Sequence, residues 1–316
     1  PVQISPMRRI DLSRDVLSVA QLIETCFADE LDDDGRAYLA YLRRMARDRT
    51  LLEWLRAHPE RLENPLNGYV WVEEGRIVGN VTMVPYRREG RPVTMIANVA
   101  VLPEYRRRGI ARQLTQQALR HARERGSSAV WLQVRDDNLG AIHLYETLGF
   151  GERARRTTWL VPASPLAQAP DDPGASLGRR GRGDWRFQSR WLDDLYPAEI
   201  RWGLGLDIQR FRPTIATSLG NWLGGTRPRH WAARRRGQLL GLLTWESSVR
   251  SSDDLWLATS AEHEQEFLRF ALPRVAALVP NGRSKAINYP AGRDEDTLSE
   301  VGLKRLGTLI WMELPL

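Results

Sequence analysis

Apolar and polar residues follow two different periods along the first half of the chain. Apolar side chains recur at helical spacing over residues 12–45, which predicts helices at the start. Residues 69–72 (YVWV) then predict a strand, the next EG pair a hairpin turn, and residues 77–85 the partner strand. The long apolar run over residues 93–102 is typical of a central strand of a sheet.

Helices and strands alternate further along this half of the chain. Residues 109–125 carry apolar side chains every four positions and stop before Gly126, which predicts a helix with a C-terminal glycine. Residues 129–134 predict a buried strand, residues 138–149 a second helix and residues 156–161 a last strand. This order indicates a mixed α/β fold of the α+β kind, in which a mostly antiparallel sheet is flanked by helices.

The length of 316 residues favours two domains. Residues 163–173 are rich in proline, alanine, aspartate and serine and show no periodicity, which predicts a linker. We therefore expect a first domain over residues 1–162 and a second over residues 174–316.

The second domain repeats the first faintly. GRIVG at residues 75–79 matches GQLLG at residues 237–241, and LGF at residues 148–150 resembles VGL at residues 301–303. Such self-similarity at matching positions indicates a tandem duplication.

The net charge is +7, from 46 basic and 39 acidic residues. This balance favours nucleic acid, an anionic membrane or a phosphorylated ligand as a partner. Lysine occurs only at Lys285 and Lys304, so compositional bias toward arginine explains part of the charge. No groove of interleaved basic and aromatic residues is visible in the sequence, and we expect no nucleic-acid partner.

The apolar stretches, the single cysteine and the histidines bear on membrane and metal binding. No apolar stretch approaches the length of a membrane span, so we expect no membrane partner and a cytoplasmic protein. The single cysteine, Cys26, lies in an apolar helical pattern that predicts core packing, and the five histidines form no short-spaced pair. We expect no metal site and leave a homo-oligomer open.

The most informative stretch is VAVLPEYRRRGIA at residues 99–111, a strand that ends in a basic turn and becomes a helix. The first N–H groups of a helix are unpaired, the helix dipole adds positive charge, and Gly109 permits close approach of a phosphate. Arg106, Arg107 and Arg108 add cations. The turn therefore predicts an anion site, although a solvated arginine run at an ordinary turn has the same sequence.

Two motifs resemble those of the GNAT (GCN5-related) N-acetyltransferase family. Arg106, Gly109 and Ala111 fit its Gln/Arg-x-x-Gly-x-Gly/Ala signature, which holds the pyrophosphate of CoA. NLGAIHLYETLGF at residues 138–150 is similar to its later helix motif, Asn-x-x-Ala-x-x-Leu-Tyr followed by Gly-Phe. The resemblance covers about residues 1–162. It implies acetyl-CoA as cofactor, an acyltransferase that transfers acetyl to a primary amine by direct attack in a ternary complex, and a tandem form with a degenerate second GNAT-like domain.

The resemblance also assigns residues. Tyr145 would donate a proton to the leaving thiolate, and Asn138, two helical turns earlier on the same face, would bond the pantetheine arm. The alternatives are a packed aromatic for Tyr145 and a helix N-cap for Asn138. The cofactor-binding residues that the resemblance implies are Val99, Ala100, Val101, Arg106, Arg107, Arg108, Gly109, Ile110, Ala111, Asn138, Ala141 and Tyr145.

The general base departs from the family pattern. Many members carry a glutamate about where Met95 stands, and methionine cannot accept a proton. Glu73, Glu74 or Glu30 could act through water, or the amine could arrive deprotonated. Asn98 could position water or occupy a strand bulge.

The sequence says less about the residues that would bind the acceptor amine. The acidic run at residues 29–34 would attract a cationic amine, although a solvated capping loop is the commoner meaning of such a run. We favour a small-molecule amine slightly over a protein acceptor.

The second half of the chain lacks the phosphate turn and the tyrosine of the first half. Residues 257–267 have no glycine and several acids where the phosphate turn would lie, and Leu298 stands opposite Tyr145 when the repeats are aligned. Because these markers are eroded and Met95 replaces a carboxylate, a non-catalytic acyl-CoA-binding or interaction module is the alternative function.

Overall fold

The structure, a computed structural model, describes residues 6–28, 31–48, 50–53, 67–162, 172–276, 278–280 and 283–316. The chain forms two compact units. One comprises Pro1–Arg153 together with Ile310–Leu316, and the other comprises Ala154–Leu309. Each is described separately below.

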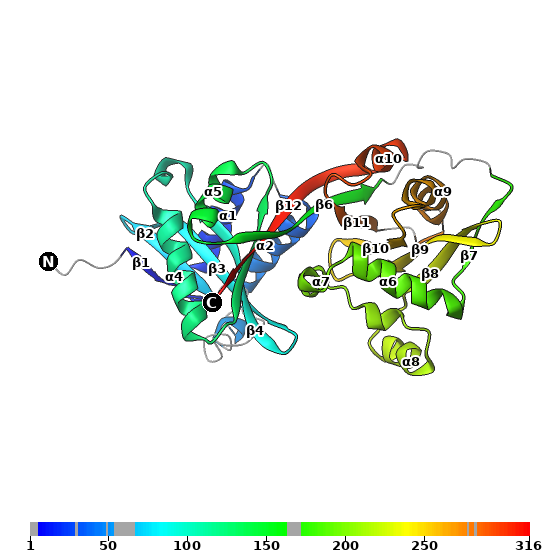
Figure 1. Cartoon of the computed structure of the whole chain (residues 1–316). Coiled ribbons are helices and arrows are strands. Elements are labelled where there is room, and N and C mark those ends of the chain that lie inside the picture. The colour runs from blue at the N-terminus through cyan, green and yellow to red at the C-terminus, as the bar shows by residue number, and fades with distance from the viewer. Residues whose placement is uncertain are drawn as a thin grey trace. The chain divides into compact units, whose positions relative to one another are not determined.

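The first unit consists of a sheet between two layers of helices (Figure 1). Its strands lie in the order β1-β2-β3-β4-β5-β12; β1 to β4 pair antiparallel, and β5 pairs parallel with β4. Its elements are β1 (Met7–Arg9), α1 (Val16–Cys26), α2 (Asp33–Met45), β2 (Gly68–Glu73), β3 (Arg76–Arg88), β4 (Arg91–Val101), the 3₁₀ turn η1 (Pro103–Tyr105), α4 (Ile110–Glu124), β5 (Ala129–Arg135), α5 (Leu139–Thr147), the start of β6 (Gly151–Val161) and the end of β12 (Lys304–Pro315).

Two apolar cores lie on the two faces of this sheet. Tyr69 and Trp71 of β2 belong to the core that includes α4, whereas Val70 between them belongs to the core of α1 and α2. Successive strand residues point to opposite faces, so α4 covers one face and α1 and α2 cover the other. A Cβ at Gly79 would stand 2.9 Å from the Ile110 side chain, which shows how closely α4 crosses β3.

The second unit repeats this architecture. Its strands lie in the order β6-β11-β10-β9-β8-β7, with β12 beside β6; β10 and β11 are parallel, and β7 to β10 pair antiparallel. Its elements are the end of β6, β7 (Ala175–Arg179), η2 (Arg182–Asp184), α6 (Trp185–Leu195), α7 (Ala198–Leu204), η3 (Ile208–Phe211), α8 (Ile215–Leu223), β8 (Arg229–Arg235), β9 (Gln238–Glu246), β10 (Ser252–Thr259), α9 (Glu264–Ala276), β11 (Ser284–Pro290), α10 (Glu295–Glu300) and the start of β12.

The glycines that repeat in the sequence occupy equivalent places in the two units. Gly75 and Gly237 have φ of 78° and 83° in hairpin turns, a conformation that favours glycine. Gly241 lies where α9 crosses β9, as Gly79 does for α4; a Cβ there would stand 2.5 Å from the Phe267 ring. The predicted fold class, two mixed and mostly antiparallel sheets flanked by helices, is confirmed.

The compact units exchange strands relative to the domain ranges expected from the sequence. Residues 154–161 of β6 belong to the second unit and pair with β11, and residues 310–316 return to the first unit beside β5. Of the predicted linker, residues 163–171 lie outside the described residues.

Candidate functional site

The predicted anion turn lies between β4 and α4. Gly109 is the N-cap of α4 with φ of 78°, and Arg107 also has a positive φ, of 64°. A Cβ at Gly109 would meet only the side chain of Gln113, at 3.9 Å. The main chain at the positive end of α4 is therefore open to a ligand.

The three arginines of this turn differ in their contacts. Arg106 Nε donates to the carbonyl of Val101 at 3.1 Å. Arg108 donates to the carbonyl of Glu104 at 3.2 Å and lies 3.6 Å from a carboxylate oxygen of Glu73. Arg107 is exposed and, within the part of the chain that the structure describes, has no hydrogen-bond or ion-pair partner. Among the described residues, the Arg107 cation is thus unpaired, Arg106 makes a partly buried hydrogen bond and Arg108 makes weak exposed contacts.

A wedge opens between β4 and β5 beside this turn. The strands pair over three residues, and the last pair is Ile96 with Leu132. Both strands continue beyond that point, to Val101 and Arg135. Their facing main-chain edges can accommodate an extended amide-bearing ligand, which is what the predicted pantetheine site requires.

The predicted strand contacts lie on the β4 side of this wedge. Val99 is half-buried, whereas Ala100 and Val101 are buried. Since the Val101 carbonyl already accepts from Arg106, it has one acceptor direction fewer for a ligand. Ile110 is buried at the start of α4, and Ala111 beside it is half-buried.

Helix α5 carries Asn138 and Tyr145. The Asn138 side chain caps the helix by accepting from the Ala141 N–H at 3.1 Å, so the N-cap role is present, and its amide N–H groups remain available. Tyr145 is buried, with its ring edge-on to Phe150 at 5.9 Å. Burial raises the pKa of Tyr145 to about 12, so the phenol is protonated at neutral pH.

The sequence analysis did not predict two residues near this site. Arg112 of α4 donates to the Thr147 hydroxyl of α5 at 2.6 Å and links the two helices that flank the wedge. Asn80 of β3 is fully buried and donates its amide N–H to the carbonyl of Asn98 at 3.0 Å. An arginine in a helix and an asparagine in a strand carry no motif signal, since both contacts depend on tertiary structure.

Asn98 occupies a strand bulge. The pairing of β3 with β4 shifts register there, and Asn98 has φ of 49°, in the left-handed region that asparagine tolerates better than most residues. Its side chain hydrogen-bonds Tyr38 of α2. Of the two predicted roles, the bulge position is the one observed.

The comparison with known proteins bears on this arrangement. Residues 23–150 match the model of the Acetyltransferase (GNAT) family. The first unit therefore carries a GNAT-family domain over these residues. A stretch of 75 residues is 40% identical to a [ribosomal protein bS18]-alanine N-acetyltransferase of Salmonella typhimurium, covering 24% of this chain and 48% of that protein. The chain thus spans about half the length of that relative.

Two further comparisons concern the sequence of one stretch and the fold of the whole chain. A stretch of 115 residues is 36% identical to a mycothiol acetyltransferase of Thermobispora bispora and covers 35% of this chain and 37% of that protein. A solved tandem GNAT protein from the clavulanic acid biosynthesis pathway aligns over 98% of both chains with a TM-score of 0.51 and 17% identity. At that identity the likeness shows the fold alone.

The carboxylates proposed as a GNAT base have other contacts. Glu73 accepts from the Trp71 indole N–H at 3.1 Å and faces Arg108, and Glu74 lies in the β2–β3 hairpin turn with φ of 49°. Glu30 lies outside the described residues. Met95 is half-buried on β4, opposite Val84.

The acidic run before α2 is used in part for local structure. Asp32 caps α2 by accepting from the Gly35 N–H at 2.8 Å, and Asp33 pairs with Arg36. Asp29 lies outside the described residues. The capping interpretation therefore accounts for two of these acids.

Other expectations concern Cys26, metals and membranes. Cys26 packs against the core beneath α4, and burial raises the pKa of its thiol. Among the described residues, no cluster of three or more potential metal ligands occurs. In the same residues, no helix is both long and apolar enough to cross a membrane.

The second GNAT-like unit closes the equivalent turn with its own side chains. Glu264, at the start of α9, is buried and ion-paired with Arg293, whose Nε lies 2.7 Å from its carboxylate. Tyr289 donates a hydrogen bond to the same carboxylate. The positive end of α9 thus already has an internal anion.

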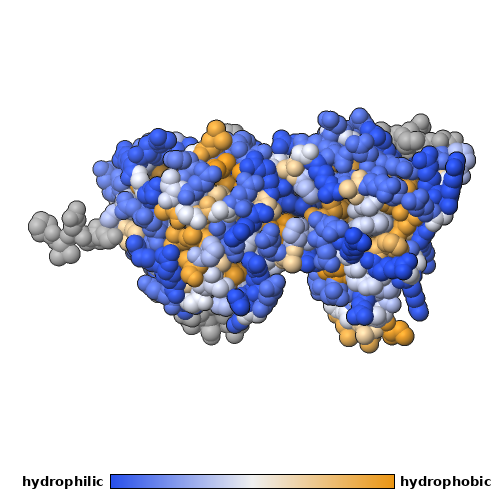
Figure 2. All heavy atoms as spheres, in the orientation of Figure 1, coloured by the Kyte–Doolittle hydropathy of each residue, from blue (hydrophilic) through white to orange (hydrophobic). Residues whose placement is uncertain are grey.

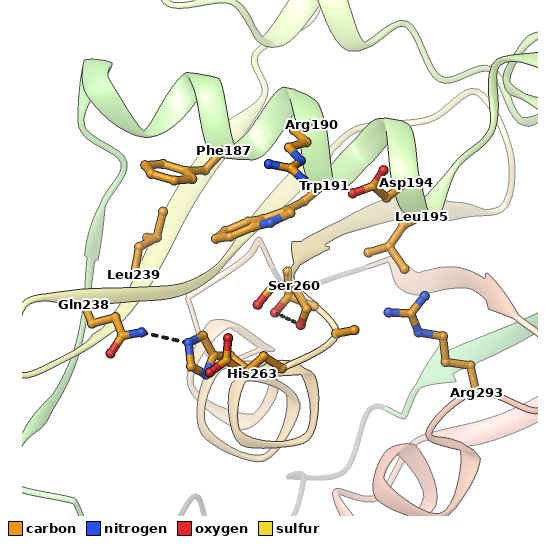
Figure 3. A pocket seen from close by; sticks show the side chains of 13 residues that line it. Phe187, Arg190, Trp191, Asp194, Leu195, Gln238, Leu239, Ser260, His263 and Arg293 are labelled. Atoms are coloured by element: carbon orange, nitrogen blue, oxygen red, sulfur yellow. Dashed lines mark hydrogen bonds between the residues drawn. The ribbon is translucent and has the colours of Figure 1, made fainter.

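A pocket of about 590 Å³ lies beside this closed turn (Figure 3). Phe187 and Trp191 of α6 form one wall, with ring centroids 5.6 Å apart, and Gln238 hydrogen-bonds His263 at 2.8 Å below them. Arg293 lies at one end of the pocket. Its charged lining residues carry both signs, so the pocket lacks the cationic character of the turn before α4.

The second unit carries a carboxylate where the first has Met95. Val84 lies five residues after Gly79 and pairs with Met95, and Glu246 lies five residues after Gly241 and pairs with Asp254. Asp254 therefore occupies the Met95 position. Burial raises the pKa of Asp254 to about 6.

Proposed function

We propose that this chain is an N-acetyltransferase that transfers acetyl from acetyl-CoA to a primary amine at the first unit. The proposal rests on the turn before α4: an open helix N-terminus with Gly109 in the left-handed region and three arginines, directly beside the β4–β5 wedge. A diphosphate fits this turn because unpaired N–H groups, the helix dipole and mobile cations all favour negative charge. A thioester bound there supplies an activated acetyl group to the wedge.

The wedge provides for the rest of the cofactor. Main-chain groups on the unpaired part of β4 would bond the pantetheine amides, and the free amide N–H groups of Asn138 would donate to a carbonyl of the same arm. The hydrogen bond from Arg112 to Thr147 joins α4 to α5 and would help to position the two sides of the site together.

Tyr145 would act on the leaving thiolate. The amine nitrogen forms a bond to the acetyl carbon while the carbon–sulfur bond breaks, and the amine proton passes to water, which leaves the amide and the CoA thiolate. Since the pKa of Tyr145 is about 12 and that of a thiol is about 8.5, complete proton transfer from the phenol is uphill. Tyr145 would therefore stabilise the thiolate chiefly by donating a hydrogen bond, and direct attack requires no covalent enzyme intermediate.

The acceptor is a small-molecule amine in preference to a protein in this proposal. The relatives are named for an alanine of ribosomal protein bS18 and for mycothiol, so both a protein and a small molecule belong in the test. Turnover of acetyl-CoA should be measured against polyamines, aminoglycosides, amino acids and a peptide that begins with alanine. Turnover above the rate of acetyl-CoA hydrolysis with at least one acceptor supports the proposal.

A non-catalytic acyl-CoA-binding module remains the second candidate, because Met95 stands where a base would be expected. CoA binding by calorimetry without turnover across the panel would favour it. Absence of CoA binding would overturn both functions.

A further inference from the structure

Helix α8 of the second unit has its apolar side turned outward. Among its nine residues, Ile215 is 85% exposed and Leu223 is 72% exposed, and Leu219 and Trp222 are also exposed. The polar side faces the unit instead: Asn221 donates to the carbonyl of Arg210 in η3 at 2.8 Å. This orientation is the reverse of an ordinary surface helix.

The exposed side forms one continuous patch. Figure 2 shows apolar atoms gathered at the end of the second unit where Figure 1 places α8. Helix α8 contains no charged residue, and its four large apolar side chains expose on the order of 500 Å² if each presents between half and most of its surface. This area is within the range of the largest apolar patch on a typical monomer, about 300–600 Å², and such patches are often functional.

The shape of the patch suits a second copy of itself. Ile215, Leu219 and Leu223 are four residues apart and form a ridge along the helix. Ala216 and Gly220 form the adjacent row, which is exposed and low; a Cβ at Gly220 would meet nothing within 4 Å. A ridge beside a groove of the same spacing is self-complementary, because each helix can insert its ridge into the groove of the other.

We propose that the exposed face of α8 is a dimer interface that packs against the same face of a second chain across a twofold axis. A stable interface needs about 800 Å² from each partner, with an apolar centre and a polar rim. The four large side chains supply more than half of this area, and the exposed Arg212 and Arg227 flank α8 in the sequence. A Trp at such a centre is a common anchor of binding energy.

The experiment compares full-length chains by sedimentation velocity and light scattering over a range of concentrations. The wild type should dimerise. The double variant Leu219→Ser/Trp222→Ser should raise the dimer dissociation constant by more than about tenfold, because it removes the centre of the patch. Val249→Ser, which alters a fully exposed apolar residue outside α8, is the matched control and should leave the constant unchanged.

The variant Gly220→Leu distinguishes a shape-complementary interface from non-specific hydrophobic association. The added side chain fills the groove but makes the patch more apolar, so a ridge-in-groove dimer weakens while non-specific association or binding to phosphatidylglycerol vesicles strengthens. Since α8 has no buried residues, all variants should keep the wild-type circular dichroism spectrum and melting temperature. A monomeric wild type, a dimer unaffected by the α8 variants, or stronger association of Gly220→Leu would each overturn the proposal.

Discussion

The turns before α4 and α9 occupy the same place in the repeated fold but have opposite chemistry. The first presents Gly109 and three arginines around an open helix N-terminus. At the second turn, buried Glu264 lies at the N-terminal end of α9 and is paired with Arg293. The same helix dipole therefore faces an open turn in one unit and an internal carboxylate in the other. We expect the sequence of this turn, and not the fold, to decide whether an anion binds.

The two units also differ in the register of their central strand pairs, β3–β4 and β9–β10. The β3–β4 pairing shifts register at Asn98, whereas β9 and β10 pair without a shift from Glu246 to Gly241. The first unit thus has the bulge and the open turn, and the second has the carboxylate Asp254 at the Met95 position. Each unit lacks something that the other contains, which is what independent change after a duplication produces.

The largest expected effect concerns the open turn. Gly109→Asp places a negative charge where phosphates would bind, and aspartate tolerates the left-handed region, so the variant should fold. CoA affinity measured by calorimetry should fall by more than about a hundredfold, equivalent to roughly 3 kcal/mol. Joint replacement of Arg106 and Arg108 by alanine should have a similar effect.

Gly126→Asp is the matched control for this turn. Gly126 follows the other end of α4 with φ of 71°, and a Cβ there meets nothing within 4 Å. Its CoA affinity should equal that of the wild type. Wild-type affinity in a folded Gly109→Asp protein would remove the basis of the proposed function.

The next effect concerns Tyr145. Tyr145→Phe keeps the ring and its packing on Phe150 but removes the hydroxyl. General acid catalysis contributes about 10²–10⁴-fold, and the high pKa of this phenol places the expected loss of kcat near the lower end, with CoA affinity unchanged. Tyr41→Phe, on an exposed tyrosine of α2, is the control. Full kcat with a true acceptor would reduce Tyr145 to a packing residue.

A third change tests whether the second turn is held by its own ion pair. Arg293→Ala leaves the Glu264 carboxylate buried without its partner, and breaking such a pair typically costs about 3–5 kcal/mol. The partial exposure of Arg293 places the expected loss of unfolding free energy at the lower end of that range. Urea denaturation measures it. CoA affinity should not change, and a parallel loss of affinity would show that the two units do not act separately.

The sequence predicts the local parts of the fold well. The spacing of Gly75 and Gly79 and its repeat at Gly237 and Gly241 predicted the duplication, because each glycine has a local reason: a turn with positive φ or a close helix crossing. The arginine-rich turn before α4 was also predicted. Its role in binding CoA stays a prediction.

Tertiary features could not be predicted in the same way. The exchange of β6 and β12 between the units depends on pairing between distant segments, and the Asn80 bond to the Asn98 carbonyl depends on strand register. The correspondence of Asp254 with Met95 likewise follows from register, since no motif marks it. Such contacts join residues whose sequence separation carries no periodic signal.

The smallest effect concerns Asp254, and its sign follows from the raised pKa. A carboxyl whose pKa rises from 3.8 in the unfolded chain to about 6 in the folded protein favours the folded state fully below pH 3.8, and this contribution is lost as pH rises through 6. At pH 7.5 the charged form is therefore held at a cost. Asp254→Asn removes that charge and should stabilise the protein at pH 7.5 by on the order of 1 kcal/mol, because Asp254 is only half-buried and solvent screens part of its charge. At pH 4 the two proteins should be nearly equal in stability.

The measurement is the difference in urea midpoint between variant and wild type across this pH range, with Asp193→Asn on an exposed residue as control. A difference that stays constant with pH would show that Asp254 does not titrate in this window, and a destabilised variant at pH 7.5 would show that attraction to Arg250 outweighs the cost of burial.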